Sequence, residues 1–119
     1  MQITYTTHSI LDEIRGERAE QIAGHGFDAS HDDSHDNEEL RMAAACYALG
    51  QTDVSLSATI GVPFAGKGFA HVSASRQLWP WDRECWKPTK RRHDLIKAAA
   101  LIVAEIERLD RLAAESEVQ

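Results

Sequence analysis

The residues between Arg76 and Pro88 combine the side chains that bind planar, phosphorylated ligands. This stretch, RQLWPWDRECWKP, holds all three tryptophans of the chain and five charged residues. An indole ring stacks on any nucleobase, and each such stack contributes about 1–3 kcal/mol. Pro80 stiffens the backbone between Trp79 and Trp81, so these rings have little flexibility to lose on binding. The alternative is that the tryptophans pin this segment onto the core, and the two interpretations can hold for different rings.

Basic residues surround and follow the tryptophans. Arg76–Lys97 contains seven Lys or Arg and three Asp or Glu. Several of these cations lie at the predicted start of the last helix, where backbone N–H groups favour an anion. We therefore predict that a nucleotide-like ligand stacks on Trp79 or Trp81 and places its phosphate among the cations, with further contacts from the acidic half of the chain. The predicted ligand-binding residues are Arg18, His31, Asp33, Trp79, Trp81, Lys87, Arg91 and Arg92.

A second group of candidate residues lies in HGFDASHDDSHDN, residues 25–37, which holds three histidines and four aspartates. Imidazole and carboxylate are the usual ligands of zinc, manganese and iron. The stretch lacks a complete ligand set at a recognisable spacing. We therefore favour a loop that uses Asp and Asn for turns and helix caps, with no metal or other cofactor. If a metal binds, its predicted ligands are His31, Asp32, Asp33 and His35.

Two carboxylate pairs form a third candidate. Glu17 and Glu20 are one helical turn apart, as are Glu107 and Asp110. The pattern resembles the magnesium-binding carboxylates of the all-α nucleotide pyrophosphohydrolases, which implies a Mg or Mn cofactor and hydrolysis of a nucleotide. The two pairs are about 90 residues apart, wider than that family's spacing. Solvated helix faces are the favoured interpretation, because acidic helices often carry such pairs.

The charge of the whole chain limits the classes of partner that it can bind. The 119 residues carry a net charge of −6, with eleven acidic and three basic residues in 1–54. An acidic protein binds extended nucleic acid poorly, since that binding requires many neutralised phosphates. No apolar run reaches the roughly 18–20 residues that cross a bilayer, and the N-terminus lacks a secretory signal. We expect one domain over residues 1–119, a cytoplasmic location, two free thiols, a small-molecule partner and no membrane.

Three helices are predicted to position these residues. The first begins at Ser9 as N-cap and is ended by Gly24 and Gly26. The second begins near Asp36 or Asn37 and ends just before Gly50. The third is capped by Thr89 and continues for about 25 residues, or roughly 37 Å.

The third predicted helix carries an apolar seam. Its members, spaced by four and three residues in turn, are Leu95, Ala99, Ile102, Ile106, Leu109 and Ala113. Ile96, Leu101 and Val103 widen the seam beyond that of a two-stranded coiled coil. We therefore predict that this helix is central and contacts both other helices and a second copy of the chain, which makes the protein a homo-oligomer. The predicted solvated face consists of Glu105, Glu107, Arg108, Asp110 and Arg111.

The fold class predicted from these patterns is mainly α. It has a three-helix core, a long C-terminal helix, and a small β-hairpin or irregular insert at about residues 51–88. Apolar residues alternate weakly through Val54, Leu56, Ala58, Ile60 and Val62, which favours a hairpin, and the glycines and Pro63 that follow favour an irregular loop.

Three segments resemble a family of small proteins from phages and prophages. They are ERAEQIAGHGFDASHDDSHDNEELRMAAACYA, LWPWDRECWKP and RRHDLIKAAALIVAEIERLDR. The resemblance covers most of the chain except the N-terminal segment and residues 51–77. It implies a bacterial host cell as the setting, and no mechanism.

A second resemblance is to the ryanodine-receptor repeat. Bacterial examples occur in nucleotide-signalling and defence contexts, so the resemblance implies a nucleotide ligand. The chain departs from the repeat at Phe27, where tryptophan is usual, and at Asp36, which replaces the proline of a His-Pro-x-Leu element; the long insert before the last helix is a further departure. The residues that match in order are Gly26-Phe27, Asp32-Asp33, His35, Leu40, Tyr47 and Lys97.

The function that these observations favour is non-catalytic capture of a nucleotide-like ligand by a small phage-derived protein, with sequestration of a host immune second messenger. One alternative is a metal-dependent nucleotide (pyro)phosphohydrolase that uses Glu17, Glu20 and the 31–35 cluster. A second alternative is an acidic protein–protein inhibitor of a host nuclease or defence complex, whose first half mimics nucleic acid.

Overall fold

A computed structural model of the chain describes residues 4–26, 28–34, 38–50, 53–57, 69–73 and 78–118. This part is mainly α-helical and ends in a long helix, as the sequence predicts. Its elements are α1 (Thr7–His25), α2 (Ala29–Asp33), α3 (Glu39–Leu49), β1 (Asp53–Ser57), β2 (Phe69–Ser73), the 3-10 helix η2 (Arg83–Cys85) and α5 (Arg91–Val118).

Helix α1 begins earlier than predicted. Its N-cap is Thr6, whose hydroxyl accepts a hydrogen bond from the Ser9 N–H at 3.1 Å, while the Thr6 N–H donates to the Ser9 hydroxyl at 2.9 Å. This is a reciprocal capping box, so Ser9 is the third helical residue and the prediction that it is the N-cap is wrong. The helix ends at Gly26, which adopts a left-handed conformation with φ 73° as predicted, and Gly24 lies inside the helix.

The stretch predicted as a loop contains the short helix α2. The Asp28 side chain caps it by accepting a hydrogen bond from the His31 N–H at 2.9 Å. Helix α3 begins at Glu39 and stops before Gly50, whose positive φ of 59° fits the predicted end. The predicted starting residues Asp36 and Asn37 lie outside the described residues.

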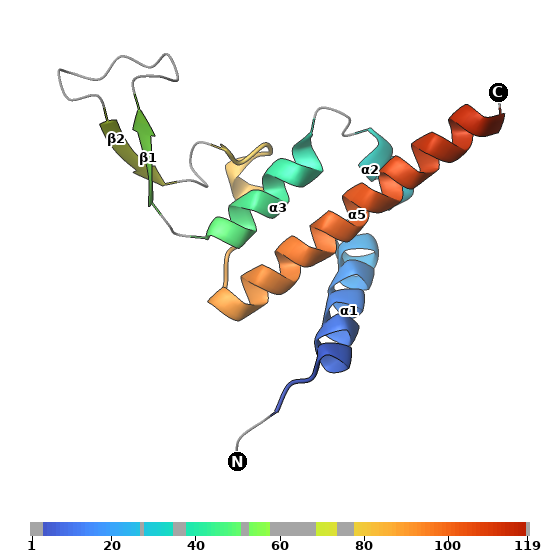
Figure 1. The fold of residues 1–119 in the computed structure, drawn as a ribbon, viewed down its shortest axis with the longest axis horizontal. Coiled ribbons are helices and arrows are strands. Elements are labelled where there is room, and N and C mark those ends of the chain that lie inside the picture. Colours follow the sequence, from blue (N-terminus) through green and yellow to red (C-terminus); the bar gives the residue numbers. More distant parts are fainter. Residues whose placement is uncertain are drawn as a thin grey trace.

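The insert at 51–88 contains a β-hairpin, one of its two predicted forms. Strands β1 and β2 are antiparallel, with register from Asp53 opposite Ser73 to Ser57 opposite Phe69. Figure 1 shows this hairpin beyond the C-terminal end of α3.

Helix α5 is the central element. It runs across the molecule with α3 along one side and α1 crossing it on the other, which confirms that the last helix contacts both other long helices (Figure 1). Its 28 residues span about 42 Å. Thr89 lies two residues before its start, and the Thr89 N–H and hydroxyl both donate to Asp94 Oδ1. Within the described residues, no helix combines the length and the apolar character needed to span a bilayer.

The core forms between small side chains of α3 and α5. Seven residues make up its fully buried cluster: Leu40, Ala43, Ala44 and Tyr47 from α3, and Ala98, Leu101 and Ala104 from α5. Alanine-rich faces let two helices approach closely, because the distance between helix axes depends on the side chains at the contact. Apart from Ile96 and Leu101, the large apolar side chains described on α5 therefore lie elsewhere.

The predicted apolar seam of the last helix is divided between core and surface: Ile96 and Leu101, which were predicted to widen it, are buried, whereas its large central members are exposed. The exposed fractions of its large members are 49% for Leu95, 50% for Ile102, 52% for Ile106 and 47% for Leu109. The buried positions of α5, which include Asp94, Ala98, Leu101 and Glu105, repeat with the same four-three spacing. Two stripes of equal period run along α5, and the alanine-rich one is buried.

The predicted solvated face is also partly wrong. Glu105 is only 5% exposed; it accepts a hydrogen bond from Arg108 Nε at 2.6 Å and lies 3.4 Å from Arg41 Nε of α3. Both guanidinium groups compensate the buried carboxylate, which makes its burial tolerable. Arg111 contacts Asp33 of α2 at 2.8 Å, so it too packs against a neighbouring element.

Candidate functional site

The three tryptophans form an aromatic cluster with Tyr47 of α3. The Trp79 ring lies edge-on to the Tyr47 ring at 5.6 Å and to the Trp81 ring at 5.5 Å, and Trp86 lies 4.7 Å from Tyr47. All three indoles are half-buried and pack against the core cluster. Such ring pairs contribute about 0.5–1.5 kcal/mol each beyond the area they bury. The tryptophans therefore have the structural role that the sequence allowed.

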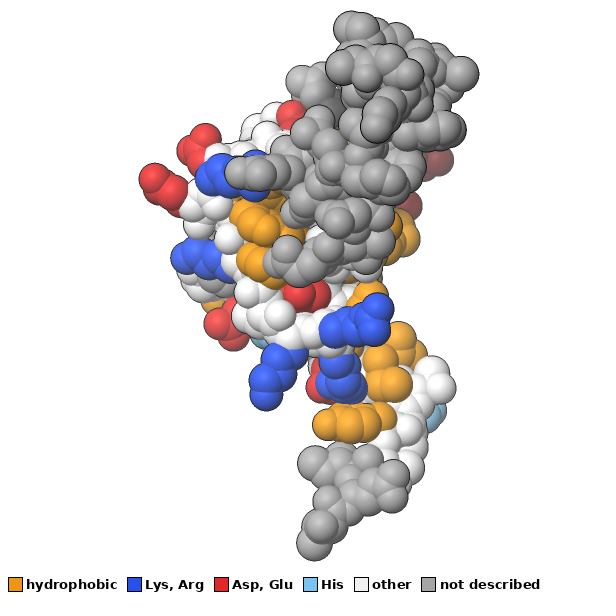
Figure 2. Space-filling view, turned by 90° about the vertical axis from the view of Figure 1, so that its left-hand side faces the viewer, with side chains coloured by type: hydrophobic (Ala, Val, Ile, Leu, Met, Phe, Trp, Pro, Cys, Tyr) orange, Lys and Arg blue, Asp and Glu red, His pale blue; other side chains and the backbone are white. Residues whose placement is uncertain are grey.

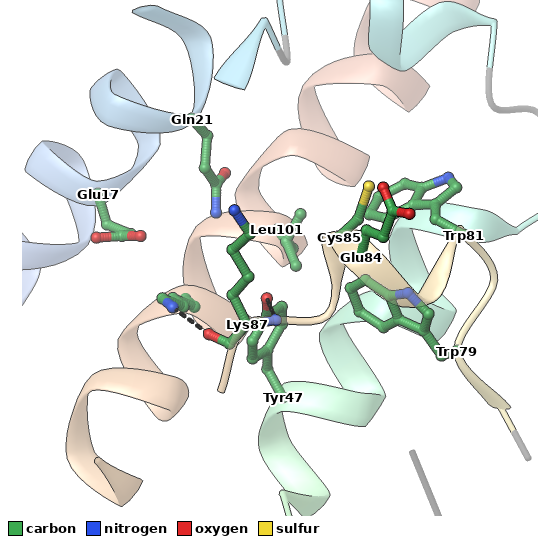
Figure 3. A pocket seen from close by; sticks show the side chains of 10 residues that line it. Glu17, Gln21, Tyr47, Trp79, Trp81, Glu84, Cys85, Lys87 and Leu101 are labelled. Carbon is green, nitrogen blue, oxygen red and sulfur yellow. Dashed lines mark hydrogen bonds between the residues drawn. The ribbon is translucent and has the colours of Figure 1, made fainter. Parts of the chain in front are cut away.

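Two of these rings also line a cavity, as the other interpretation requires. The cavity has a volume of about 390 Å³, within the range of pockets that hold small molecules. We call it the aromatic pocket, and Figure 3 shows the residues around it. They are Glu17, Gln21, Tyr47, Trp79, Trp81, Glu84, Cys85, Lys87, Lys97 and Leu101.

Hydrogen bonds hold the tryptophan segment against the helices. Trp79 Nε1 donates to the Asp82 carbonyl at 2.9 Å, which folds the segment into a tight turn ahead of η2. The Lys87 N–H donates to the Tyr47 hydroxyl at 3.3 Å, and Lys97 Nζ donates to the Lys87 carbonyl at 2.7 Å. The segment is thus attached to both α3 and α5, so the positions of its rings are determined by the fold.

The aromatic pocket contains a buried polar group without a partner. Gln21 of α1 is 4% exposed, and its Oε1 accepts no hydrogen bond from the described residues. Leaving such a group unsatisfied destabilises a protein by about 1–3 kcal/mol. Gln21 lines the pocket, and its Oε1 is covered, so a ligand N–H would supply the missing donor once the amide turns toward the cavity.

The charges in the pocket come from two carboxylates and two ammonium groups. Glu17 is held by His93 Nε2 at 3.2 Å, and Lys97 is engaged with the Lys87 carbonyl. The Lys87 ammonium and the exposed Glu84 carboxylate make no ion pair in the described part of the chain. Lys87 is therefore the cation available to a ligand.

Figure 3 shows how these groups face the cavity. The aromatic rings, with Glu84 and Cys85, form one side, while Glu17 and Gln21 of α1 form the other. The Lys87 side chain extends from its loop toward Gln21. Burial raises the pKa of the Tyr47 phenol above its ordinary value, so this phenol is uncharged near neutral pH.

The predicted ligand-binding residues divide between the pocket and its surroundings. The structure brings Trp79, Trp81 and Lys87 together in the aromatic pocket. Arg91 lines a separate cavity of about 290 Å³ at the start of α5. Arg92 forms a two-pronged ion pair with Glu13 and lies over the Tyr5 ring at 3.9 Å, away from the pocket.

The residues predicted from the acidic half form a structural network. Arg18 is buried and donates from Nη2 to Asp32 Oδ2 at 2.7 Å and from Nε to Glu107 Oε1 at 2.9 Å. The Asp32 Oδ1 contacts His31 Nδ1 at 3.0 Å, and the His31 ring lies 6.0 Å from the Trp81 ring. His31 thus adjoins the aromatic pocket without lining it, and Arg18 lies outside its lining. Asp33 pairs with Arg111 at the surface.

The candidate metal ligands are engaged with cations. Asp32 and Asp33 each contact an arginine, and His35 lies outside the described residues. Of the two predicted carboxylate pairs, Glu17 contacts His93 and Glu107 contacts Arg18. Among the described residues, no three His, Cys, Asp or Glu side chains are grouped as a metal site requires.

Several pocket residues were absent from the ligand site predicted from the sequence. One of them could have been suspected from the sequence, because Lys97 is a charged residue within an apolar stretch of a predicted helix. Such residues frequently have a specific partner, because burying an unpaired polar group is unfavourable. The others come from separate elements, and their meeting depends on the fold. The residues missed are Gln21, Tyr47, Glu84, Cys85, Lys97 and Leu101.

Comparison with known proteins leaves the two resemblances as predictions. No protein-family model matches the chain, and neither a curated protein nor a solved structure matches it. The phage-protein and ryanodine-repeat resemblances therefore still rest on the motifs alone. Of the residues that carry the ryanodine-repeat resemblance, Phe27 and His35 lie outside the described residues.

Proposed function

We propose that this protein captures a nucleotide-like ligand in the aromatic pocket without catalysing its conversion. The observation that supports the proposal best is that Gln21, a residue lining the cavity walled by Trp79 and Trp81, is buried with an Oε1 that lacks a hydrogen-bond donor in the described residues. A planar base with an N–H edge satisfies both features, because it stacks on an indole and donates to the amide oxygen. A purely apolar ligand would leave the amide unsatisfied.

The charged groups of the pocket indicate where the phosphate end of the ligand binds. The Lys87 ammonium lines the pocket and makes no ion pair with any residue that the structure describes, so we place the phosphate there, where a charge-assisted hydrogen bond contributes most. Lys97 supports this arrangement indirectly, since its hydrogen bond to the Lys87 carbonyl positions that residue. Arg91, at the separate cavity, and Arg92, paired with Glu13, are not part of this proposed site.

The setting of the proposal comes from the sequence resemblances. A phage-derived protein with this pocket would act in the cytoplasm of a bacterial host cell and sequester an immune second messenger. Its proposed partners are a nucleotide-like small molecule and a second copy of this chain. Capture requires no general base and no metal, which distinguishes it from the hydrolase alternative.

The proposal predicts ligand protection of one thiol. Cys46 is fully buried, and burial raises its pKa, whereas Cys85 is exposed and lines the aromatic pocket. A thiol reagent such as DTNB should therefore modify Cys85 in the native protein and Cys46 only after unfolding, because the thiolate is the reactive form. A nucleotide that binds in excess EDTA should slow the Cys85 reaction and raise the melting temperature.

Each alternative gives a different result in that experiment. If no nucleotide from a panel of mononucleotides, dinucleotides and cyclic forms changes either readout, nucleotide capture is wrong. Hydrolysis of a nucleotide that depends on added Mg²⁺ or Mn²⁺ would instead support the hydrolase. Co-purification of a host nuclease or defence complex, without any nucleotide affinity, would support the protein–protein inhibitor.

A substitution at Gln21 is expected to increase stability and to decrease nucleotide affinity. Replacing Gln21 with Met keeps the size of the side chain and removes the unsatisfied amide oxygen. We expect the free energy of unfolding without ligand to rise by about 1 kcal/mol, because the desolvation penalty is removed. Nucleotide affinity should fall, because the base loses its acceptor. Urea unfolding and calorimetric titration measure the two effects, and a variant that is destabilised or binds normally would contradict the assignment.

A further inference from the structure

The exposed apolar seam of α5 has the spacing of a helix-pairing surface. Its six members, Leu95, Ala99, Ile102, Ile106, Leu109 and Ala113, extend along about 27 Å of the helix. Val103 and Leu112, which are also exposed, widen it on both sides. Isolated exposed apolar residues are ordinary, but a continuous stripe of this kind marks an interaction site. Alternate steps of four and three residues match the core positions of a coiled coil.

The sizes of the side chains specify the direction of a paired helix. In a parallel pair each residue faces its own copy, so Ala99 would face Ala99 and leave a poorly filled layer. In an antiparallel pair, Leu95 of one copy faces Ala113 of the other, Ala99 faces Leu109, and Ile102 faces Ile106. Every layer then contains either one large and one small residue or two isoleucines. Even filling is what a close-packed interface requires.

The charges at the two ends of α5 favour the same direction. The helix begins beside exposed basic residues, Lys90 and Arg91, and ends with the exposed acidic residues Glu115 and Glu117. Figure 2, which views the end of the molecule where α5 begins, shows Lys and Arg side chains gathered on that face. An antiparallel pair places the basic end of one helix beside the acidic end of the other, and it also opposes the helix dipoles. A parallel pair would bring like charges together.

We infer that two copies of this chain associate through this seam as an antiparallel α5 pair with two-fold symmetry. The inference is independent of nucleotide capture, because the residues of α5 that line the aromatic pocket, Lys97 and Leu101, lie outside the seam. The pocket therefore does not need the second copy, and the loss of one property leaves the other measurable.

The oligomeric state of an α5 variant tests whether the seam is the dimer interface. Ile102 lies in the central layer and is half-exposed in one chain, so Ile102→Glu should preserve the fold and abolish the dimer. Ala114→Glu adds the same charge at an exposed position outside the seam and should leave the dimer intact. Sedimentation equilibrium measures the mass, and circular dichroism shows that both variants keep their helices. A monomeric wild-type protein, or a dimer that Ile102→Glu does not weaken, would overturn the inference.

Cross-linking tests the direction without disrupting the interface. In a Cys85→Ser background, one chain carries Leu95→Cys and a second carries Ala113→Cys, while the buried Cys46 is left in place. A short bismaleimide should link the two chains when they are mixed and should link neither chain to itself. Linkage of Leu95→Cys to its own copy would indicate a parallel pair and overturn the antiparallel arrangement.

Discussion

Replacing Asp32 with alanine is expected to lower the free energy of unfolding by about 3–5 kcal/mol. The Asp32 side chain is completely buried, and it accepts a hydrogen bond from Arg18 Nη2 at 2.7 Å and contacts His31 Nδ1 at 3.0 Å. Arg18 is itself buried, and without Asp32 the ion pair left to it among the described residues is the one with the half-exposed Glu107. The charge of Arg18 would then be insufficiently compensated in a medium that solvates ions poorly. Small domains are stable by about 5–15 kcal/mol, so this loss removes a large part of the total.

The neighbouring aspartate is the matched control for this variant. Asp33 also pairs with an arginine, Arg111, at 2.8 Å, but its side chain is 44% exposed. Ion pairs that water can reach contribute about 1 kcal/mol or less, so Asp33→Ala should change the urea midpoint only slightly. The double variant Asp32→Ala with Arg18→Met removes both buried charges and should recover part of the stability. Equal losses for the two aspartates would show that burial does not set the strength of the Arg18 interaction.

Replacing Lys87 with glutamine is expected to weaken nucleotide binding by about 10- to 100-fold. Its ammonium lines the aromatic pocket without an ion pair in the described residues, so a phosphate placed there would form a charge-assisted hydrogen bond. Such bonds contribute about 1.5–3 kcal/mol, and each 1.4 kcal/mol corresponds to a factor of ten in affinity. The Lys87 side chain is exposed and lies outside the core cluster, so the fold should be unaffected. Calorimetric titration in EDTA measures the affinity directly.

The variant Lys90→Gln is the control that distinguishes direct contact with the phosphate from long-range electrostatic attraction. Lys90 is an exposed cation three residues further along, outside the lining of the aromatic pocket. Lys90→Gln should therefore reduce the affinity much less than Lys87→Gln, and raising the salt concentration should remove most of its remaining effect. If both variants lose affinity equally, Lys87 contributes only to the overall field and the phosphate lies elsewhere.

The predictions that rested on local chemistry agree with the structure, within a few residues. Gly26 and Gly50 end α1 and α3 because the left-handed or otherwise positive φ at these positions suits glycine. A single long helix after Pro88 is confirmed, and so is its contact with both other long helices. The start of α1 was placed wrongly at Ser9 because Thr6 and Ser9 are both capping residues, and only their reciprocal hydrogen bonds identify the true N-cap.

Only part of the candidate site could be predicted from the sequence, because its residues come from separate elements. Tryptophan content and charge indicated Trp79, Trp81 and Lys87, which share one segment of the chain. Tyr47 lies on a different helix and was not predicted as a ligand-binding residue. Gln21 was not predicted as a ligand-binding residue either, because nothing in the neighbouring sequence shows that it lines a cavity.

The amino-acid sequence by itself determined where α1 and α3 end, that the last helix is long, and that the aromatic and basic residues are close together in the chain before it. These properties depend on neighbouring residues and on backbone conformations that each side chain allows. Only the tertiary structure decided which face of α5 is buried. Two stripes with the same period run along that helix, one through Ile102 and Ile106 and one through Leu101 and Glu105. Hydrophobicity favours burial of the first, but the alanines beside the second fit closely against α3, and arginines compensate its buried carboxylate.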